Sequence, residues 1–229
     1  MAELIKRILG SATGKVGDLV FKRYKNGKVF ISTHKGFNTI SESPNCVDNR
    51  ARFNTAVKFS KAVNSLPELR QIWKSSNIEG RSAYTKILSF NIKLFKNSSP
   101  SLINRISPKG FGFITDNLIL SNNLISIDIK LGSNSSELLN NSYTANFIVA
   151  LFNQKPGNDE ITFPYIMATA DYIPEKTEDF KNIIANLDSV QKQYVKEFTK
   201  AVVYIAFTNV KVKPHIYSSS FGISTDIVP

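Results

Sequence analysis

After Pro108 the chain consists of short apolar or alternating segments separated by turn residues, and this pattern limits the fold more than any other feature. Asparagine pairs and a Pro-Gly-Asn-Asp run mark turns between them. Strands are therefore expected near residues 111–120, 123–131, 143–152, 161–172, 200–208 and 215–227.

Several short strands at this spacing predict an antiparallel β-sandwich of immunoglobulin-like or related type over residues 109–229. One stretch of this region, residues 177–199, stays ambiguous between helix and strand. Phe180, Ile183, Ile184 and Leu187 have helical spacing, so a helix followed by a strand is one interpretation.

The preceding region, residues 37–108, has the apolar spacing of helices. Together with the strands it predicts an α+β fold. The first helix is expected from Val47 to Ser65, and the second starts at a Ser65–Glu68 segment with the spacing of a capping box. The third is expected from Ser82 to Lys96. The predicted buried faces are Phe53, Ala56, Val57, Ser60 and Val63 in the first helix, Leu69, Ile72 and Trp73 in the second, and Ala83, Ile87, Phe90 and Leu94 in the third.

The first 36 residues are expected to form an arm with a basic β-hairpin. Two β-rich runs, Leu19–Tyr24 and Lys28–Thr33, flank Asn26-Gly27, the strongest short hairpin signal. An isolated hairpin is marginal in water, so this one must pack on the rest of the chain or on another molecule. Ahead of it, the apolar side chains of Leu4, Ile5, Ile8 and Leu9 fall on one face of a short helix.

Positive charge is confined to the first part of the chain. The protein has a net charge of +11, with 18 Lys and Arg against 6 Asp and Glu in residues 1–100 and 11 against 12 in residues 101–229. This asymmetry indicates a polyanionic or acidic partner for the N-terminal part. A solvated basic face, or an acidic neighbouring subunit, accounts for it equally well.

The best functional candidates are basic and aromatic side chains of the hairpin and the first helix. Clustered Lys and Arg neutralise phosphates, and exposed aromatic rings stack on bases. No zinc-finger spacing, RNP signature or clear helix-turn-helix accompanies them, so this nucleic-acid signal is electrostatic only. The candidate contacts to a polyanion or a subunit are Lys22, Arg23, Lys25, Lys28, Arg50, Arg52, Lys58 and Lys61, and the candidate interface aromatics are Phe21, Tyr24 and Phe30.

Two regions resemble a poorly characterised family of bacterial and bacteriophage-associated proteins. The first is the Gly10-x-x-Thr-Gly-Lys-Val-Gly17 segment followed by the Asn-Gly hairpin and an Arg-x-Arg-Phe helix, and the second is Ala201–Phe207 followed by Ser218–Gly222. A Gln-containing segment usual in the family is replaced here by residues 43–47. The resemblance implies a β-rich, non-catalytic protein from a mobile element or a virion.

The sequence contains no recognisable group of catalytic or metal-binding residues. Gly10 to Lys15 has one residue too few between its glycines for a phosphate loop and lacks the following Ser or Thr. The two histidines, His34 and His215, have no Cys or second His at ligand spacing, and Cys46 stands alone. We therefore expect no cofactor, no metal and no enzymatic activity, although an enzyme with a scattered site remains a third hypothesis.

The sequence also indicates where the protein is located and what it binds. No apolar run has the roughly 18 residues of a membrane span, and charges interrupt the N-terminus where a secretion signal would have its apolar core. A virion or cytoplasmic location is expected. The leading hypothesis is a structural protein that assembles through its N-terminal hairpin arm, as a homo-oligomer or with other structural subunits. The alternative is a non-specific nucleic-acid-binding protein, or one that binds an acidic protein surface.

Overall fold

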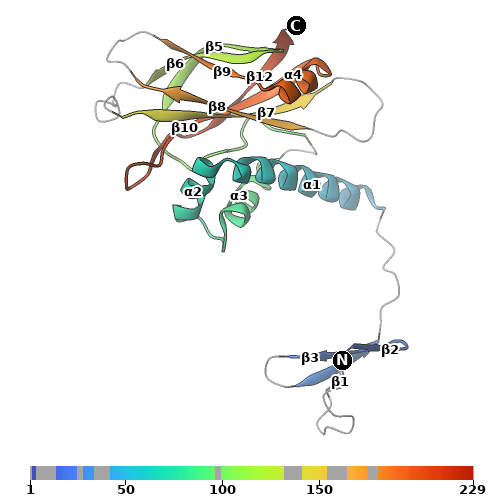
Figure 1. The fold of residues 1–229 in the computed structure, drawn as a ribbon. Coiled ribbons are helices and arrows are strands. Elements are labelled where there is room, and N and C mark those ends of the chain that lie inside the picture. The colour runs from blue at the N-terminus through green and yellow to red at the C-terminus, as the bar shows by residue number, and fades with distance from the viewer. Residues whose placement is uncertain are drawn as a thin grey trace. The chain divides into compact units, whose positions relative to one another are not determined.

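The computed structural model describes residues 2–3, 14–24, 28–33, 42–95, 99–131, 141–153, 164–174 and 180–228. They belong to two compact units, Met1–Ser43 and Pro44–Pro229. Within the described residues there are four helices and a majority of strands (Figure 1), so the predicted α+β class is confirmed.

The N-terminal unit contains a four-stranded antiparallel sheet in the order β1-β4-β3-β2. Both predicted hairpin strands are confirmed. Gly17 turns the chain from β2 into β3 at a φ of +57°, which side chains with a Cβ rarely adopt. Asn26-Gly27 and the predicted helical face at residues 4–9 lie outside the described residues. The strands are β1 (Ala2–Glu3), β2 (Gly14–Val16), β3 (Leu19–Arg23) and β4 (Val29–Thr33).

The second unit is built on an eight-stranded sheet in the order β8-β7-β10-β12-β5-β6-β9, with β11 paired to β10. All six predicted strand regions are strands. They are β5 (Phe113–Ser121), β6 (Leu124–Leu131), β7 (Tyr143–Phe152), β8 (Tyr165–Tyr172), β10 (Lys200–Asn209), and, from the last region, β11 (Ile216–Tyr217) and β12 (Phe221–Val228); β9 (Lys181–Asn186) is the additional strand.

This sheet is nearly closed and barrel-like, and it is not clearly the two-sheet sandwich that the sequence predicts. A short parallel pairing of β12 with β5, at Ile227–Leu120 and Val228–Ser121, joins what would otherwise be two layers. The ends of the path, β8 and β9, lie close together. Apart from this junction every strand pair in the path is antiparallel.

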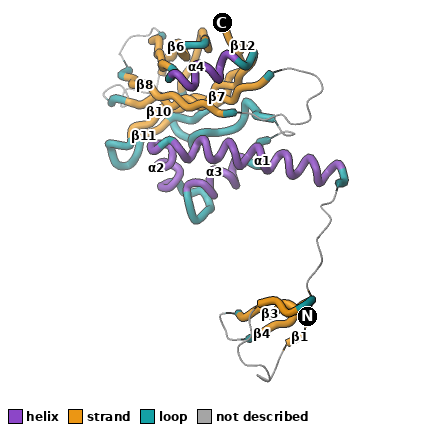
Figure 2. The backbone as a smooth tube through the Cα atoms, turned by 45° about the vertical axis from the view of Figure 1, so that its right-hand side comes forward, coloured by secondary structure: helices purple, strands orange, loops and turns teal. Residues whose placement is uncertain are grey.

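The central strands β7 and β10 are buried on both faces, which explains their unbroken apolar sequences. One face of each, with Phe147 and Phe207 among its side chains, lies in the core inside the curled sheet. The other face, with Ile148 and Tyr204, packs in a second core beneath three helices. These helices are α1 (Pro44–Ser65), α2 (Pro67–Ser75) and α3 (Ala83–Asn91), and all three lie on one side of the sheet (Figures 1 and 2). Helices α1 and α2 contact strands β8 and β10, and α3 packs on α1 and α2.

The buried face of α1 differs from the prediction. Phe53 is 51% exposed, whereas Phe59 is fully buried and meets the rings of Tyr165 and Tyr204 edge to face. Burial in α1 begins only at Thr55, because the first half of the helix extends beyond the sheet. The helical spacing therefore predicts the burial of Ala56, Ser60 and Val63 correctly. It does not show at which residue of the helix the contact with the core begins.

The third helix also ends earlier than predicted. Phe90 is 37% exposed, and the buried face of α3 consists of Ala83, Ile87 and Asn91. The Asn91 amide donates to the carbonyl of Arg105 and accepts from its N–H, at 2.9 and 2.8 Å. A buried asparagine thus fixes the segment after α3, and such polar burial breaks the apolar pattern used for the prediction.

The ambiguous stretch reverses the order suggested by its spacing. Lys181–Asn186 forms β9, whose pairing with β6 buries Ile183 and Ala185 and exposes Ile184. The helix follows it as α4 (Ser189–Lys196), which begins at a capping box made by Asp188 and Gln191. The interpretation as a helix followed by a strand is wrong. Buried and exposed side chains alternate over the six residues of β9, and this strand pattern overrides the helical spacing of the apolar residues.

Candidate functional site

Strand register separates the side chains of the N-terminal sheet onto two faces. Residues opposite each other in paired strands share a face, and neighbours along a strand alternate. Phe21 lies opposite both Ile31 and Gly14, and Leu19 lies opposite both Val16 and Thr33. One side of the sheet, the apolar face, therefore carries Val16, Leu19, Phe21, Val29 and Ile31, with Arg23 and Thr33 at its margins.

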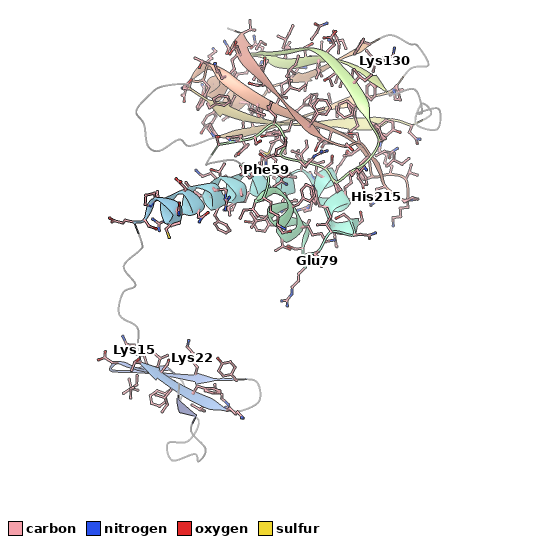
Figure 3. All side chains as sticks on the ribbon, turned by 180° about the vertical axis from the view of Figure 1, so that it is seen from behind. Lys15, Lys22, Phe59, Glu79, Lys130 and His215 are labelled. Carbon is pink, nitrogen blue, oxygen red and sulfur yellow. The ribbon has the colours of Figure 1, made fainter. Side chains whose placement is uncertain are left out.

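The opposite side, the basic face, gathers lysines and two aromatic rings. Lys15 lies opposite Val20, and Lys22 lies opposite Phe30. Figure 3 shows Lys15 and Lys22 projecting from the same side of the sheet. The Tyr24 ring meets the Phe30 ring edge to face, with centroids 5.0 Å apart. The basic face consists of Lys15, Val20, Lys22, Tyr24, Lys28, Phe30 and Ser32.

Neither face of this sheet is covered within the described part of its unit. Every described residue from Gly14 to Thr33 is partly or fully exposed. Val16 is 69% exposed and Leu19 42%, although both belong to the apolar face. A single layer with an exposed apolar face is not a self-sufficient core, since stable domains pack at least two layers.

The predicted hairpin residues divide between these two faces. Lys22, Lys28, Tyr24 and Phe30 lie on the basic face, whereas Arg23 and Phe21 lie on the apolar side. Lys25 lies outside the described residues. Sequence reasoning missed Lys15 as part of this surface, because the three-residue strand β2 is too short to show an alternating pattern. Only the pairing of β2 with β3 shows that Lys15 and Val16 lie on opposite faces of the sheet.

The basic residues of the first helix form a narrower group than predicted. Lys61 follows Arg50 by eleven residues, about three helical turns, and Lys58 lies about 80° around the helix from Arg50, so the three share one side of α1. Arg52 lies roughly 200° around the helix from Arg50. Its guanidinium donates to the Asn49 side chain at 2.9 Å.

A second candidate site surrounds Glu68, which the sequence assigns to a capping box. The N-cap of α2 is Leu66, without a side-chain cap bond, so that prediction is wrong. Glu68 turns instead toward the sheet, where its Oε1 accepts from the Thr144 hydroxyl at 2.9 Å and its Oε2 accepts from the Thr208 hydroxyl. The buried Asn146 amide donates to the Thr208 hydroxyl at 2.8 Å, which orients that hydroxyl toward Glu68.

This polar cluster lies where the helix-facing sides of β7 and β10 change from apolar to polar. The helix-facing row of β10 runs Val202, Tyr204, Ala206 and then Thr208. Thr144 and Thr208 are opposite each other in register. A signal for this site was present in the sequence, because Thr144 and Thr208 are polar positions near the ends of strands that are apolar along most of their length.

Beside the cluster is a pocket of about 200 Å³. Its polar lining includes two carboxylates, Glu68 and Asp171, and one ammonium group, Lys211. Ile173 and Val210 add apolar surface. The remaining lining residues are Ser142, Tyr143, Thr144, Thr208 and Asn209.

The described residues contain no cluster of three or more His, Cys, Asp or Glu side chains arranged to hold a metal ion. His215 has its Nδ1 3.1 Å from the carbonyl oxygen of Val212, and His34 lies outside the described residues. Among the helices of the described segments, none has the length and apolar character to span a membrane.

Comparison of the chain with protein-family models, with curated proteins and with solved structures found no match.

Proposed function

We propose that this protein is a non-enzymatic structural protein that assembles with further copies of itself through its N-terminal sheet. The observation that carries this proposal is the apolar face of a single-layer sheet, on which Val16 and Leu19 are exposed and Phe21, Val29 and Ile31 are partly exposed. Burial of such side chains contributes roughly 25 cal/mol for each Å² removed from water. The free energy available on covering this face is therefore a strong drive toward a second layer.

A second copy of the same sheet supplies that layer with matching chemistry. Two apolar faces packed against each other form a two-layer sandwich with the spacing of about 10 Å common to packed sheets. The charged residue on this side, Arg23, pairs with Val29 at the strand end, away from Leu19 and Val16. Face-to-face pairing keeps it at the rim and leaves the lysines of both basic faces in water.

Packing on a face is favoured over addition of a strand to an edge. The edge strand β2 has three residues and β1 has two, so an added strand would gain few main-chain hydrogen bonds. The apolar face, in contrast, spans β2, β3 and β4. The resemblance to bacteriophage-associated proteins supports a role in a virion or a related particle, where identical subunits associate repeatedly.

The proposal is tested by placing charge on the apolar face of the full-length chain. Val16→Lys combined with Leu19→Lys changes two exposed positions, so the monomer should fold normally. Light scattering coupled to size-exclusion chromatography should show oligomers for the unaltered protein and monomers for this variant. Tyr24→Lys, at a 53% exposed position on the basic face, is the matched control and should remain oligomeric. Monomers at all concentrations in the unaltered protein would refute the proposal.

A second candidate function, non-specific binding of nucleic acid, is favoured by the basic face. Three lysines share that face with the edge-to-face pair of Tyr24 and Phe30. Lysines neutralise phosphates, and exposed rings stack on unpaired bases. This function predicts affinity for single strands that falls steeply with salt. Affinity that does not change with salt would remove it.

A further inference from the structure

We propose that the pocket beside Glu68 binds a small organic amine, whose ammonium group sits between the carboxylates of Glu68 and Asp171. This inference concerns the second unit of the chain and is independent of the assembly proposed above. It begins from the position of Thr144, which pairs with Asp171 in the sheet and donates a hydrogen bond to Glu68 of α2.

Thr144 is a neighbour of both Asp171 and Glu68, which belong to different elements. Asp171 on β8 is the direct cross-strand partner of Thr144 on β7. Such partners have Cβ atoms about 4.5–5.5 Å apart and share a face of the sheet. The Thr144 hydroxyl in turn donates to Glu68 Oε1. Both acidic residues and Thr144 line the same pocket.

The Glu68 carboxylate is held in place and still has capacity to accept. Each of its oxygens accepts one threonine hydroxyl, while a carboxylate offers about four acceptor positions. Thr208, which is 1% exposed, is fixed by the equally buried Asn146. A rigidly supported carboxylate with unused lone pairs is suited to an ammonium group, since charge-assisted hydrogen bonds are among the strongest in proteins.

The charge and size of the pocket define the class of ligand. Among the described lining residues, two carboxylates and one lysine give a net negative charge in a protein whose net charge is +11. Ile173 and Val210 offer apolar contact to an alkyl chain. The volume of about 200 Å³ lies below the range of pockets that enclose drug-sized ligands. An alkyl amine or diamine fits these three properties.

The test is isothermal titration calorimetry of the full-length protein with cadaverine, a linear diamine. Glutarate, of similar length and opposite charge, and pentanol, which is neutral, serve as comparison ligands. We expect saturable binding of cadaverine alone. Glu68→Gln and Asp171→Asn should each weaken it by about tenfold or more, because each removes a charged partner of the ammonium group.

Glu197→Gln, at an exposed carboxylate at the end of α4, is the control with the same change of charge and should bind cadaverine normally. Asp171 is exposed, so Asp171→Asn tests the site even if Glu68→Gln impairs folding. No saturable binding up to about 10 mM would overturn the proposal. Equal affinity in Asp171→Asn and the unaltered protein, or binding of glutarate and pentanol as tight as that of cadaverine, would overturn it as well.

Discussion

The rings of Tyr24 and Phe30 meet edge to face on the side of the N-terminal sheet that also carries Lys15 and Lys22. The side chains that alternate with them, such as Phe21 and Ile31, lie on the other side. Charge and apolar surface are therefore segregated by strand register alone. One face combines lysines with aromatic rings and the other is mainly apolar, so each can be altered without the other.

Charge reversal on the basic face should weaken binding to single-stranded nucleic acid if that face takes the polyanion. Lys15→Glu with Lys22→Glu removes two candidate phosphate-binding groups. The slope of log affinity against log salt should then fall by about 0.7 for each phosphate that is no longer neutralised. Fluorescence anisotropy with an oligonucleotide measures it. Lys93→Glu with Lys196→Glu, two exposed lysines of the second unit, makes the same charge change and should have a smaller effect. Equal weakening by both variants would contradict a specific role of the basic face.

Removal of the Phe59 ring should destabilise the second unit far more than removal of the Phe53 ring from the same helix. Phe59 is fully buried between α1 and the sheet (Figure 3), whereas Phe53 is 51% exposed. Phe59→Ala should lower the free energy of unfolding by about 3–5 kcal/mol, and Phe53→Ala by less than about 1 kcal/mol. Urea unfolding followed by tryptophan fluorescence measures both. Similar losses of unfolding free energy in the two variants would mean that α1 packs against the sheet through a different set of residues.

A methyl group at Gly110 should be far more costly than one at Gly112. A Cβ on Gly110 would lie 2.9 Å from the Tyr217 carbonyl carbon and closer still to its oxygen, in a segment that Ser219 holds through its hydroxyl. A Cβ on Gly112 would have no atom within 4 Å. Gly110→Ala should therefore reduce the free energy of unfolding by about 1–3 kcal/mol or more, and Gly112→Ala should change it little. Thermal unfolding of the two variants measures the difference, and equal melting temperatures for Gly110→Ala and Gly112→Ala would contradict this prediction.

The two tyrosines that meet Phe59 should respond differently to loss of their hydroxyls. The Tyr204 hydroxyl donates to the Ser101 carbonyl at 2.9 Å, so Tyr204→Phe should cost about 1 kcal/mol. The Tyr165 hydroxyl is shielded from solvent and has no hydrogen-bond partner within the described segments. Tyr165→Phe should be neutral or stabilising, because it removes a buried polar group. A loss above about 1 kcal/mol in Tyr165→Phe would show that its hydroxyl is paired.

The same tyrosines predict a loss of stability at high pH. Burial raises the pKa of both phenols above the ordinary value of 10.0, and at Tyr204 the neighbouring Tyr165 adds to the effect. Above pH 10 the unfolded chain loses these protons while the folded chain keeps them, so stability falls as pH rises. Below pH 10 both states are protonated and the contribution is constant. Unfolding between about pH 9 and 11 should show a shallower decline in Tyr165→Phe than in the unaltered protein; an unchanged decline would refute the assignment.

Strand positions were the most predictable part of the fold, because short apolar runs and turn residues are local signals. Lys28–Thr33 and Tyr143–Phe152 show this most clearly. Closure of the sheet was not predictable. It depends on a two-residue parallel pairing between β5 and β12, whose sequence separation exceeds a hundred residues. No local pattern carries that information.

The candidate residues were predictable by type but not by partner. Lys22, Tyr24 and Phe30 were identified as surface candidates, yet only the pairing of β3 with β4 assigns them to one face. Glu68 illustrates the opposite failure. Its position after Ser65 fits a local capping signal, but the hydroxyls of Thr144 and Thr208 bind it from strands far away in sequence. The hydrogen bonds from Thr144 and Thr208 to Glu68 therefore take the place of the capping-box hydrogen bond that the local sequence predicts.

Sedimentation velocity of the nuclease-treated chain, with and without residues 1–43, would decide whether the N-terminal unit joins copies of this protein. The second unit, Pro44–Pro229, has its own two cores and should remain folded, as its circular dichroism would show. We expect concentration-dependent oligomers for the full chain and a monomer for the truncated one, because the truncation removes the exposed apolar face. Oligomers of the same size from the truncated protein would refute assembly through the N-terminal sheet.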